Sequence, residues 1–537
     1  MKGTILGLLV LLLLAGPAVV QAQDAYSTNA DGSVYAYNTN ADGSANIAGY
    51  SGPPWAVTIP TNINNLLVTS IGGEAFQNCT NLTSVTIPGT VTNWGGYAFA
   101  FCYNLTNATI SNGVTSIGVE AFYGCTNLTN VTIPGSVTSL GQGAFQFCAS
   151  LTSVTIPGSI TNIPKAAFAS CYDLTSVTIA NGVTSIGTNM ETSFGAFYDC
   201  TNLTNVMMPD SLISIGYETF KLCVNLTSVT IPASVTNIGL GAFCGDGLTS
   251  VTIPGSVTSL GQGAFQDCTS LTSVTIPGNI TNITDSAFAF CTGLTSVTIA
   301  NGVTSIGGGI DPLWGAFGFC YNLTNVTIPG SVTNIGYKAF VECYSLTSIT
   351  IPGSVTSIGE EAFAFCTNLS SVNIPNSVTN ISDFAFEECY SLTSVTVPGG
   401  VTNIGYEAFG YCTSLTSVYF TGSPPSVNAF PFYGSPVTFF YYLPGTAGWR
   451  TYLDGIRTVL WDPLGSSGDV SFGVQNNQFG FKFTGPANLA IVVEACTNLA
   501  SPDWIPLQTN TLTNGSFSFS EPLQTNNSGR FYRITSP

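Results

Sequence analysis

Sulfur chemistry is the first possibility that this sequence raises, because its cysteines recur at a fixed spacing. The chain holds 16 cysteines and no histidine. Two series with a 23-residue period run from Cys79 to Cys171 and from Cys320 to Cys412. The absence of histidine excludes Ser-His-Asp and Cys-His catalysis, and every metal site that needs an imidazole ligand. The pattern therefore indicates a repeated structural unit, and we expect no catalytic residue, metal or cofactor.

Fourteen cysteines share one position of this unit: Cys79, Cys102, Cys125, Cys148, Cys171, Cys200, Cys223, Cys268, Cys291, Cys320, Cys343, Cys366, Cys389 and Cys412. Stacked units would place successive Cα atoms about 5 Å apart, which is within disulfide range. Their side chains would nevertheless point in parallel into a core, where cysteine packs as a small hydrophobe. We expect a column of reduced, packed thiols, which leaves Cys244 and Cys496 as the candidates for reactive thiols.

Glutamate offers a second possible chemistry, because it recurs immediately before an Ala-Phe or Thr-Phe pair, at Glu74, Glu120, Glu218, Glu361 and Glu407. A glycosidase needs two carboxylates that face each other across the scissile bond. These glutamates recur singly, at the start of a short predicted helix, where negative charge is favourable. We interpret them as structural.

The segment from Leu128 to Cys148 shows which elements the repeat must contain. Val131 and Ile133 alternate with polar residues in the period of a strand. Pro134 cannot donate to a strand ladder and ends it. The sequence GAFQFC then reads as one or two turns of helix. The expected core positions are Leu128, Val131, Ile133, Val137, Leu140, Ala144, Phe145 and Cys148.

One such unit cannot bury its own apolar face, so neighbouring units must stack into a solenoid. Fifteen strands begin with a leucine, from Leu82 to Leu415, and they would form a parallel sheet about 70 Å long. The motifs LTSVTIP, VTSIG and AFxxC resemble the BspA-type leucine-rich repeat family over about residues 56–420. That resemblance implies a parallel sheet on the inner face of an arc, short helical turns outside, and a surface protein that binds host or matrix components.

The predicted fold is thus a leucine-rich-repeat solenoid with 23-residue repeats plus a small C-terminal all-β domain. The predicted divisions are a signal peptide (1–22), an N-terminal β-hairpin cap (23–60), the solenoid with fifteen strand units (61–418), a C-terminal cap (419–463), a linker (464–469) and an all-β module (470–537).

Three units depart from the period. Six extra residues interrupt the repeat between Ile186 and Ala196 and again between Ile306 and Ala316. The two places lie 120 residues apart, which indicates that a block of five units was duplicated together with its insertion. The unit around Cys244 is one residue short, with its cysteine displaced, and we expect a local irregularity there.

Charge and hydropathy limit the kinds of partner that the protein can bind and its expected location relative to the cell. Without the predicted signal peptide the chain has 8 basic and 27 acidic residues, a net charge of −19, so nucleic acid and anionic membranes are poor partners. No later segment reaches the roughly 18 apolar residues of a transmembrane helix. We expect a secreted or cell-surface protein; its oligomeric state is not predicted.

The candidate ligand-binding residues are an outward-facing column on the predicted sheet: Thr109, Thr132, Thr155, Thr178, Met207, Thr230, Thr252, Thr275 and Thr298. Hydroxyl and amide groups there could hold an extended peptide or a glycan, although threonine also simply suits an exposed strand. We expect a non-enzymatic recognition or adhesion protein that binds protein or glycan ligands. The alternatives are a passive spacer that presents the C-terminal module and, more remotely, a carbohydrate-active enzyme.

Overall fold

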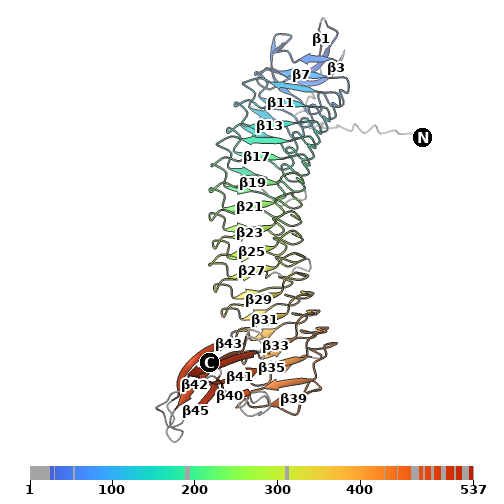
Figure 1. Cartoon of the computed structure of the whole chain (residues 1–537). Helices are drawn as coiled ribbons and strands as arrows, with labels where there is room; N and C mark the ends of the chain where they lie inside the picture. The colour runs from blue at the N-terminus through green and yellow to red at the C-terminus, as the bar shows by residue number, and fades with distance from the viewer. Residues whose placement is uncertain are drawn as a thin grey trace, which may run out of the picture.

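The structure is a computed structural model that describes residues 25–29, 31–52, 55–187, 194–308, 314–428, 430–443, 445–460, 471–475, 478–484, 489–496, 504–512, 516–522 and 531–535. The predicted signal peptide (1–22) and linker (464–469) lie outside these residues, as does the side chain of Cys496. Figure 1 shows a slender column of stacked coils that bends only gently.

The first sheet of the column is parallel and contains one strand per unit. Its fifteen regular strands are β7 (Ser84–Ile87), β9 (Asn107–Ile110), β11 (Asn130–Thr132), β13 (Ser153–Ile156), β15 (Ser176–Ile179), β17 (Asn205–Met207), β19 (Ser228–Thr230), β21 (Ser250–Thr252), β23 (Ser273–Ile276), β25 (Ser296–Ile299), β27 (Asn325–Thr327), β29 (Ser348–Thr350), β31 (Ser371–Asn373), β33 (Ser394–Val397) and β35 (Ser417–Phe420). Paired strands lie in register, as Ser153–Ile156 does against Ser176–Ile179. Ladder pairing lapses at several junctions, such as β11 to β13, although these strands still adjoin.

A second parallel sheet, which the sequence analysis did not predict, follows the turn after each first-sheet strand. It consists of β8 (Asn93–Trp94), β10 (Ser116–Ile117), β12 (Ser139–Leu140), β14 (Asn162–Ile163), β16 (Ser185–Ile186), β18 (Ser214–Ile215), β20 (Asn237–Ile238), β22 (Ser259–Leu260), β24 (Asn282–Ile283), β26 (Ser305–Ile306), β28 (Asn334–Ile335), β30 (Ser357–Ile358), β32 (Asn380–Ile381), β34 (Asn403–Ile404) and β36 (Ser426–Val427). Each strand is only two residues long, which is too short to show the alternation of apolar and polar residues by which a strand is recognised in a sequence.

The third side of each unit is built from turns, and the predicted helical turns are wrong: the described residues contain no helix. The N–H groups of Glu120, Phe122 and Gly124 donate to carbonyls of the following unit at 2.8–2.9 Å. Glu120 and Gly124 have positive φ values of 51° and 69°, which no right-handed helix contains. A segment this short cannot nucleate a helix by itself. Its N–H groups therefore bond to carbonyl groups of the next unit and not within the segment.

Close approach of the units explains a column of glycines at the end of most second-sheet strands. A Cβ atom added to Gly141 would lie 2.4 Å from backbone atoms of Gly118 and Val119. Only glycine allows this contact without displacing the backbone.

The core is continuous along the column. All eight predicted core positions of the Leu128–Cys148 unit are at most 6% exposed. Sixteen phenylalanines, one per unit from Phe76 to Phe432, stack with ring centroids 4.7–5.5 Å apart and interplanar angles of 3–18°. Aromatic rings at this separation add attraction beyond the burial of their surface.

Both ends of the column carry additional strands. At the start are β1 (Ala25–Thr28), β2 (Val34–Thr39), β3 (Ala45–Ser51), β4 (Ala56–Thr58), β5 (Asn62–Ile63) and β6 (Leu66–Ile71). The strands β1, β2 and β3 are antiparallel neighbours, whereas β4 pairs in parallel with β7. At the far end β37 (Phe439–Tyr442) and β39 (Ile456–Leu460) extend the first sheet, and β38 (Tyr452–Leu453) forms a hairpin with β39.

The last described strands are antiparallel and belong to two small sheets: β40 (Ser471–Gln475), β41 (Gln478–Thr484) and β44 (Ser516–Pro522) in one, and β42 (Ala490–Cys496), β43 (Ile505–Thr511) and β45 (Phe531–Thr535) in the other. They share a separate apolar cluster that includes Ile491, Val493 and Phe519.

The short unit near Cys244 places an aspartate in the cysteine column. Asp246 is 2% exposed and accepts a 2.9 Å hydrogen bond from the N–H of Cys223, while its Oδ2 has no partner. Burial raises the pKa of the Asp246 carboxyl well above its usual range. Cysteines at this position donate a hydrogen bond to a phenylalanine carbonyl, as Cys223 does to Phe197. An aspartate can donate a hydrogen bond only when its carboxyl is protonated.

Truncation of one ring of the phenylalanine stack should destabilise the column. We expect Phe145→Ala to cost about 3–5 kcal/mol, because it leaves a cavity between two units. The change is measured as a lower melting temperature and faster limited proteolysis. Tyr172→Ala, which removes a ring that is 39% exposed, is the control and should change stability by less than about 0.5 kcal/mol. Equal effects of the two substitutions would contradict a continuous core.

Replacement of Asp246 by cysteine should stabilise the protein in a pH-dependent way. Because the folded-state pKa of Asp246 is raised, its contribution to stability is fully present below pH 3.8 and is lost as the pH rises toward the raised value. We therefore expect Asp246→Cys to raise the melting temperature at pH 8 by several degrees and to change it little near pH 4. A difference that is independent of pH would show that the carboxyl does not keep its proton.

Candidate functional site

The structure brings the nine predicted face residues into one column on the first sheet. Strand register aligns Thr109 with Thr132, Thr155 with Thr178, and Thr275 with Thr298. All nine side chains are exposed except that of Thr178, which is half-buried. A neighbouring column, two residues earlier in each strand, contains only serine and asparagine. The two columns together form an uncharged face of hydroxyl and amide groups.

Threonines elsewhere in the unit have different roles, because most of their hydroxyls bond to the preceding unit. On one flank of the face Thr129 Oγ1 donates to the carbonyl of Thr106 at 3.1 Å, and Thr295 Oγ1 to that of Thr272 at 3.0 Å. Threonines directly before the second-sheet strands repeat this pattern, as Thr304 does with Thr281 at 2.9 Å. These bonds join consecutive units along both edges.

The face column is the exception to this use of hydroxyl groups. Within the described residues, the hydroxyls of its threonines make no hydrogen bond to another group of the chain, apart from a 4.0 Å contact from Thr178 Oγ1 to Met207 Sδ. They keep their donors and acceptors for a ligand or for water. Met207, which is 57% exposed, adds a flexible apolar side chain of a kind that adapts to binding partners.

The fourteen cysteines of the column are free, and all but the half-buried Cys79 are fully buried. From Cys102 onward each Sγ donates to the carbonyl of a phenylalanine in the preceding unit, as Cys148 does to Phe122 at 3.3 Å. That carbonyl also accepts the N–H of Cys125 at 3.2 Å. Burial raises the pKa of the Cys148 thiol well above its ordinary value. These thiols serve as hydrogen-bond donors within the core.

Two members of this column were missed by the sequence analysis, Asp246 and Ser435. The Ser435 hydroxyl donates to the carbonyl of Phe409 at 2.7 Å, just as a cysteine would. Both residues lie 23 positions after a column cysteine, and that spacing could have identified them. Cys244 is the neighbouring half-buried thiol, and burial raises its pKa to about 11.

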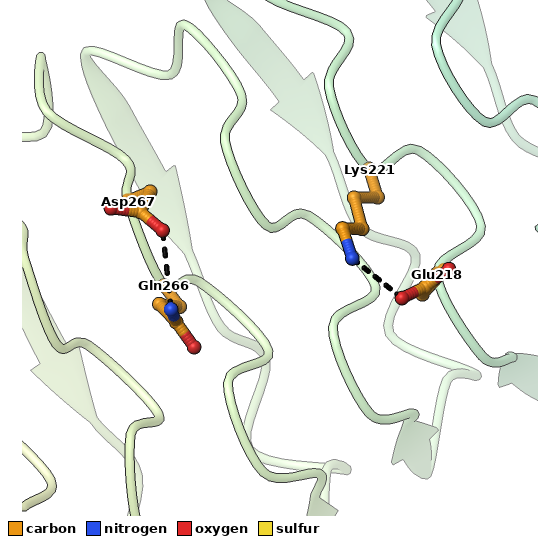
Figure 2. A network of polar contacts seen from close by, with 4 residues as sticks. All are labelled: Glu218, Lys221, Gln266 and Asp267. Atoms are coloured by element: carbon orange, nitrogen blue, oxygen red, sulfur yellow. Dashed lines mark hydrogen bonds and ion pairs between the residues drawn. The ribbon is translucent and has the colours of Figure 1, made fainter. Parts of the chain in front are cut away.

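The predicted helix start at the five recurring glutamates is wrong, because these residues lie in turns with φ between 45° and 61°. Figure 2 shows Glu218 in a 2.6 Å ion pair with Lys221, which follows it three residues later, and Gln266 bonded to Asp267 at 3.2 Å in a neighbouring part of the turn side. Glu361 pairs with Lys338 at 3.3 Å. These contacts give Glu218 and Glu361 structural partners.

One titratable carboxyl of the turn side was not singled out from the sequence. The pKa of Glu387 is raised to about 7, first by burial and then by the charges of Glu407, Glu388 and Glu361. The concentration of acidic residues in adjacent units of the sequence could have indicated this raised pKa. Across the described residues, no group of three or more Cys, Asp or Glu side chains could hold a metal ion.

Comparison with known proteins identifies the repeat. The model of the BspA type leucine rich repeat region, in six copies, matches residues 69–190, 190–310 and 315–438. The chain belongs to the BspA-type leucine-rich repeat family. No curated protein sequence matches it significantly.

Solved structures of bacterial leucine-rich repeat proteins resemble this family member. A leucine-rich repeat protein from Bacteroides ovatus is 31% identical, with a TM-score of 0.59, over 68% of this chain and 93% of that chain. A leucine rich cell surface protein from Faecalibacterium prausnitzii is 29% identical, with a TM-score of 0.39, over 69% and 94% of the two chains. No catalytic family is indicated, and no described helix is long and apolar enough to cross a membrane.

Thiol labelling should distinguish the packed column from its exceptions. In the native protein at pH 8 we expect a thiol reagent to modify Cys244 and Cys79 slowly, because burial raises their pKa values to about 11 and 12, and to leave the thirteen fully buried thiols unmodified. After denaturation without a reductant, all fifteen thiols from Cys79 to Cys412 should react. The variant Cys244→Ser should lack one of the thiols that are labelled in the native protein. Fewer than fifteen reactive thiols would reveal disulfides and contradict the hydrogen-bonded column.

Proposed function

We propose that this protein is an exported, non-enzymatic recognition protein whose first sheet binds an extended protein ligand. The observation that supports this function best is the column of exposed threonine hydroxyls without internal partners, beside columns whose hydroxyls bond to the backbone. An extended ligand can satisfy hydroxyl and amide groups at every unit that it crosses. Affinity then grows with the number of units engaged, since each contact is weak.

The rigidity of the column supports the same function. A ligand-binding face that is fixed by stacking loses little conformational entropy when the ligand binds. Exposed Met207 provides an apolar anchor near the centre of the threonine column, between Thr178 and Thr230. The family relationship is consistent with a protein-interaction surface outside the cell. We also propose that the C-terminal strands form a separate module over the predicted residues 470–537. The column would then separate this module from the N-terminal end of the protein.

Two matched double variants test the role of the face. Thr252→Lys with Thr298→Lys places two charges on the threonine column, whereas Thr269→Lys with Thr413→Lys places them at exposed turn positions directly after cysteines of the column. The full chain and both variants are screened on an array of extracellular proteins, and hits are measured by surface plasmon resonance. We expect the face variant to weaken binding at least tenfold, which corresponds to about 1.4 kcal/mol, and the turn variant to bind normally.

The two alternatives give different results in the same experiment. Equal binding by both variants would show that the ligand binds somewhere other than the first sheet. Absence of any protein ligand on the array would favour a passive spacer. Melting temperatures of all three proteins establish that the substitutions leave the fold intact, as expected for exposed positions.

A further inference from the structure

A cavity opens on the second sheet, away from the first-sheet face, and Gly308 forms part of its lining. It has a volume of about 490 Å³, and the side chains around it include Asn282, Thr284, Asp285, Ser305 and Asn334. Asn282, Ser305 and Asn334 come from the neighbouring strands β24, β26 and β28. Its size is within the range of pockets that bind small organic ligands.

Hydrogen bonds fix the polar groups of this cavity. The carboxylate of Asp285 accepts the N–H of Gly308 at 3.2 Å. Asn334 Nδ2 donates to Ser305 Oγ at 3.1 Å, and Ser305 Oγ donates to the carbonyl of Gly307 at 2.5 Å. Thr284 Oγ1 donates to the carbonyl of Leu260 at 3.2 Å. The remaining lone pairs and N–H groups therefore have defined positions before any ligand arrives.

The duplicated block provides an internal comparison 120 residues earlier in the chain. The earlier copy keeps Asn162 and Ser185, but Ser185 Oγ donates to Asn162 Oδ1 at 2.8 Å and occupies one acceptor site of that amide. In the later copy Ser305 bonds to Gly307 instead, and the Asn282 side chain has no hydrogen-bond partner among the described residues. Asn282 in the later copy thus lacks the internal donor that Asn162 has in the earlier copy.

Three further differences separate the copies. Where the later copy has Thr284, Asp285 and Asn334, the earlier copy has Pro164, Lys165 and Ser214. Thr284 and Pro164 also stand where most units have the close-contact glycine. A carboxylate, a hydroxyl and a longer amide therefore occur together only in the later copy.

We propose that this cavity binds a neutral sugar residue of a glycan. The Asn282 amide and the Asp285 carboxylate, which also accepts the N–H of Gly308, can pair with neighbouring hydroxyl groups of a sugar, which both donate and accept. Asn334 Oδ1 accepts a 3.3 Å bond from Ser357 and its Nδ2 donates to Ser305, so Asn334 contributes its second N–H. None of the described lining residues is basic, so they offer no positive charge to a phosphate or sulfate group. One carboxylate among the described lining residues is also a weak set for Ca²⁺, which takes six to eight oxygen ligands. This site is separate from the first-sheet face and gives the protein a second binding function.

The full-length protein is tested by saturation-transfer NMR with neutral hexoses, N-acetylhexosamines and their disaccharides, followed by titration calorimetry. We expect at least one neutral sugar to bind with a dissociation constant on the order of 1 mM. The variant Thr284→Pro with Asp285→Lys, which carries the residues of the earlier copy, should weaken binding at least tenfold. The reciprocal variant, with Pro164→Thr, Lys165→Asp and Ser214→Asn, should gain binding.

The face variant Thr252→Lys with Thr298→Lys is the control and should bind the sugar normally, whatever becomes of the protein ligand. Inorganic phosphate, sulfated disaccharides and Ca²⁺ are titrated in parallel. Tighter binding of any of these three probes than of the neutral sugars would overturn the proposal. So would binding of no neutral sugar, or unchanged binding by the Asp285 variant with a normal melting temperature.

Discussion

Each unit of this protein obtains its core contacts and many of its hydrogen bonds from the units on either side, and the rest of the structure depends on that constraint. N–H groups that flank the strands, such as those of Thr106 and Gly141, donate to the preceding unit, whereas N–H groups of the turn side, such as that of Phe122, donate to the following unit. The phenylalanine of every unit stacks on two others inside the column, and its carbonyl accepts the cysteine thiol of the next unit. A unit without its neighbours would therefore have unpartnered backbone groups on both of its sides.

The same constraint creates the candidate binding face. Stacking consumes the hydroxyls of the threonines at both edges of the strands, because they lie beside carbonyls of the preceding unit. The face column points away from the backbone of every unit and has no such partner. A chain with only 7% charged residues thus presents a regular polar surface that needs no ion pairs. Its polar groups are held at the spacing of parallel strands.

The sequence predicted much of this arrangement and failed at identifiable places. The period, the core positions from Leu128 to Cys148 and the fifteen first-sheet strands follow from side-chain patterns that alternate or repeat. The helical turns at GAFQFC were wrong, since periodicity shows which residues are buried but not where their N–H groups bond. Asp246 was overlooked because the nearby Cys244 resembled a displaced member of the column, although the true column position carries the carboxyl.

The sequence by itself determined that identical short units must stack, that their apolar residues line one core, and that no histidine chemistry operates. Tertiary structure alone decided which hydroxyls bond to the backbone, which remain on the surface, and how two nearly identical blocks came to differ at Asn162 and Asn282. The reason is physical. Burial depends on the type of each residue and on its place in the period, whereas a hydrogen bond depends on which atoms of another unit come within about 3 Å.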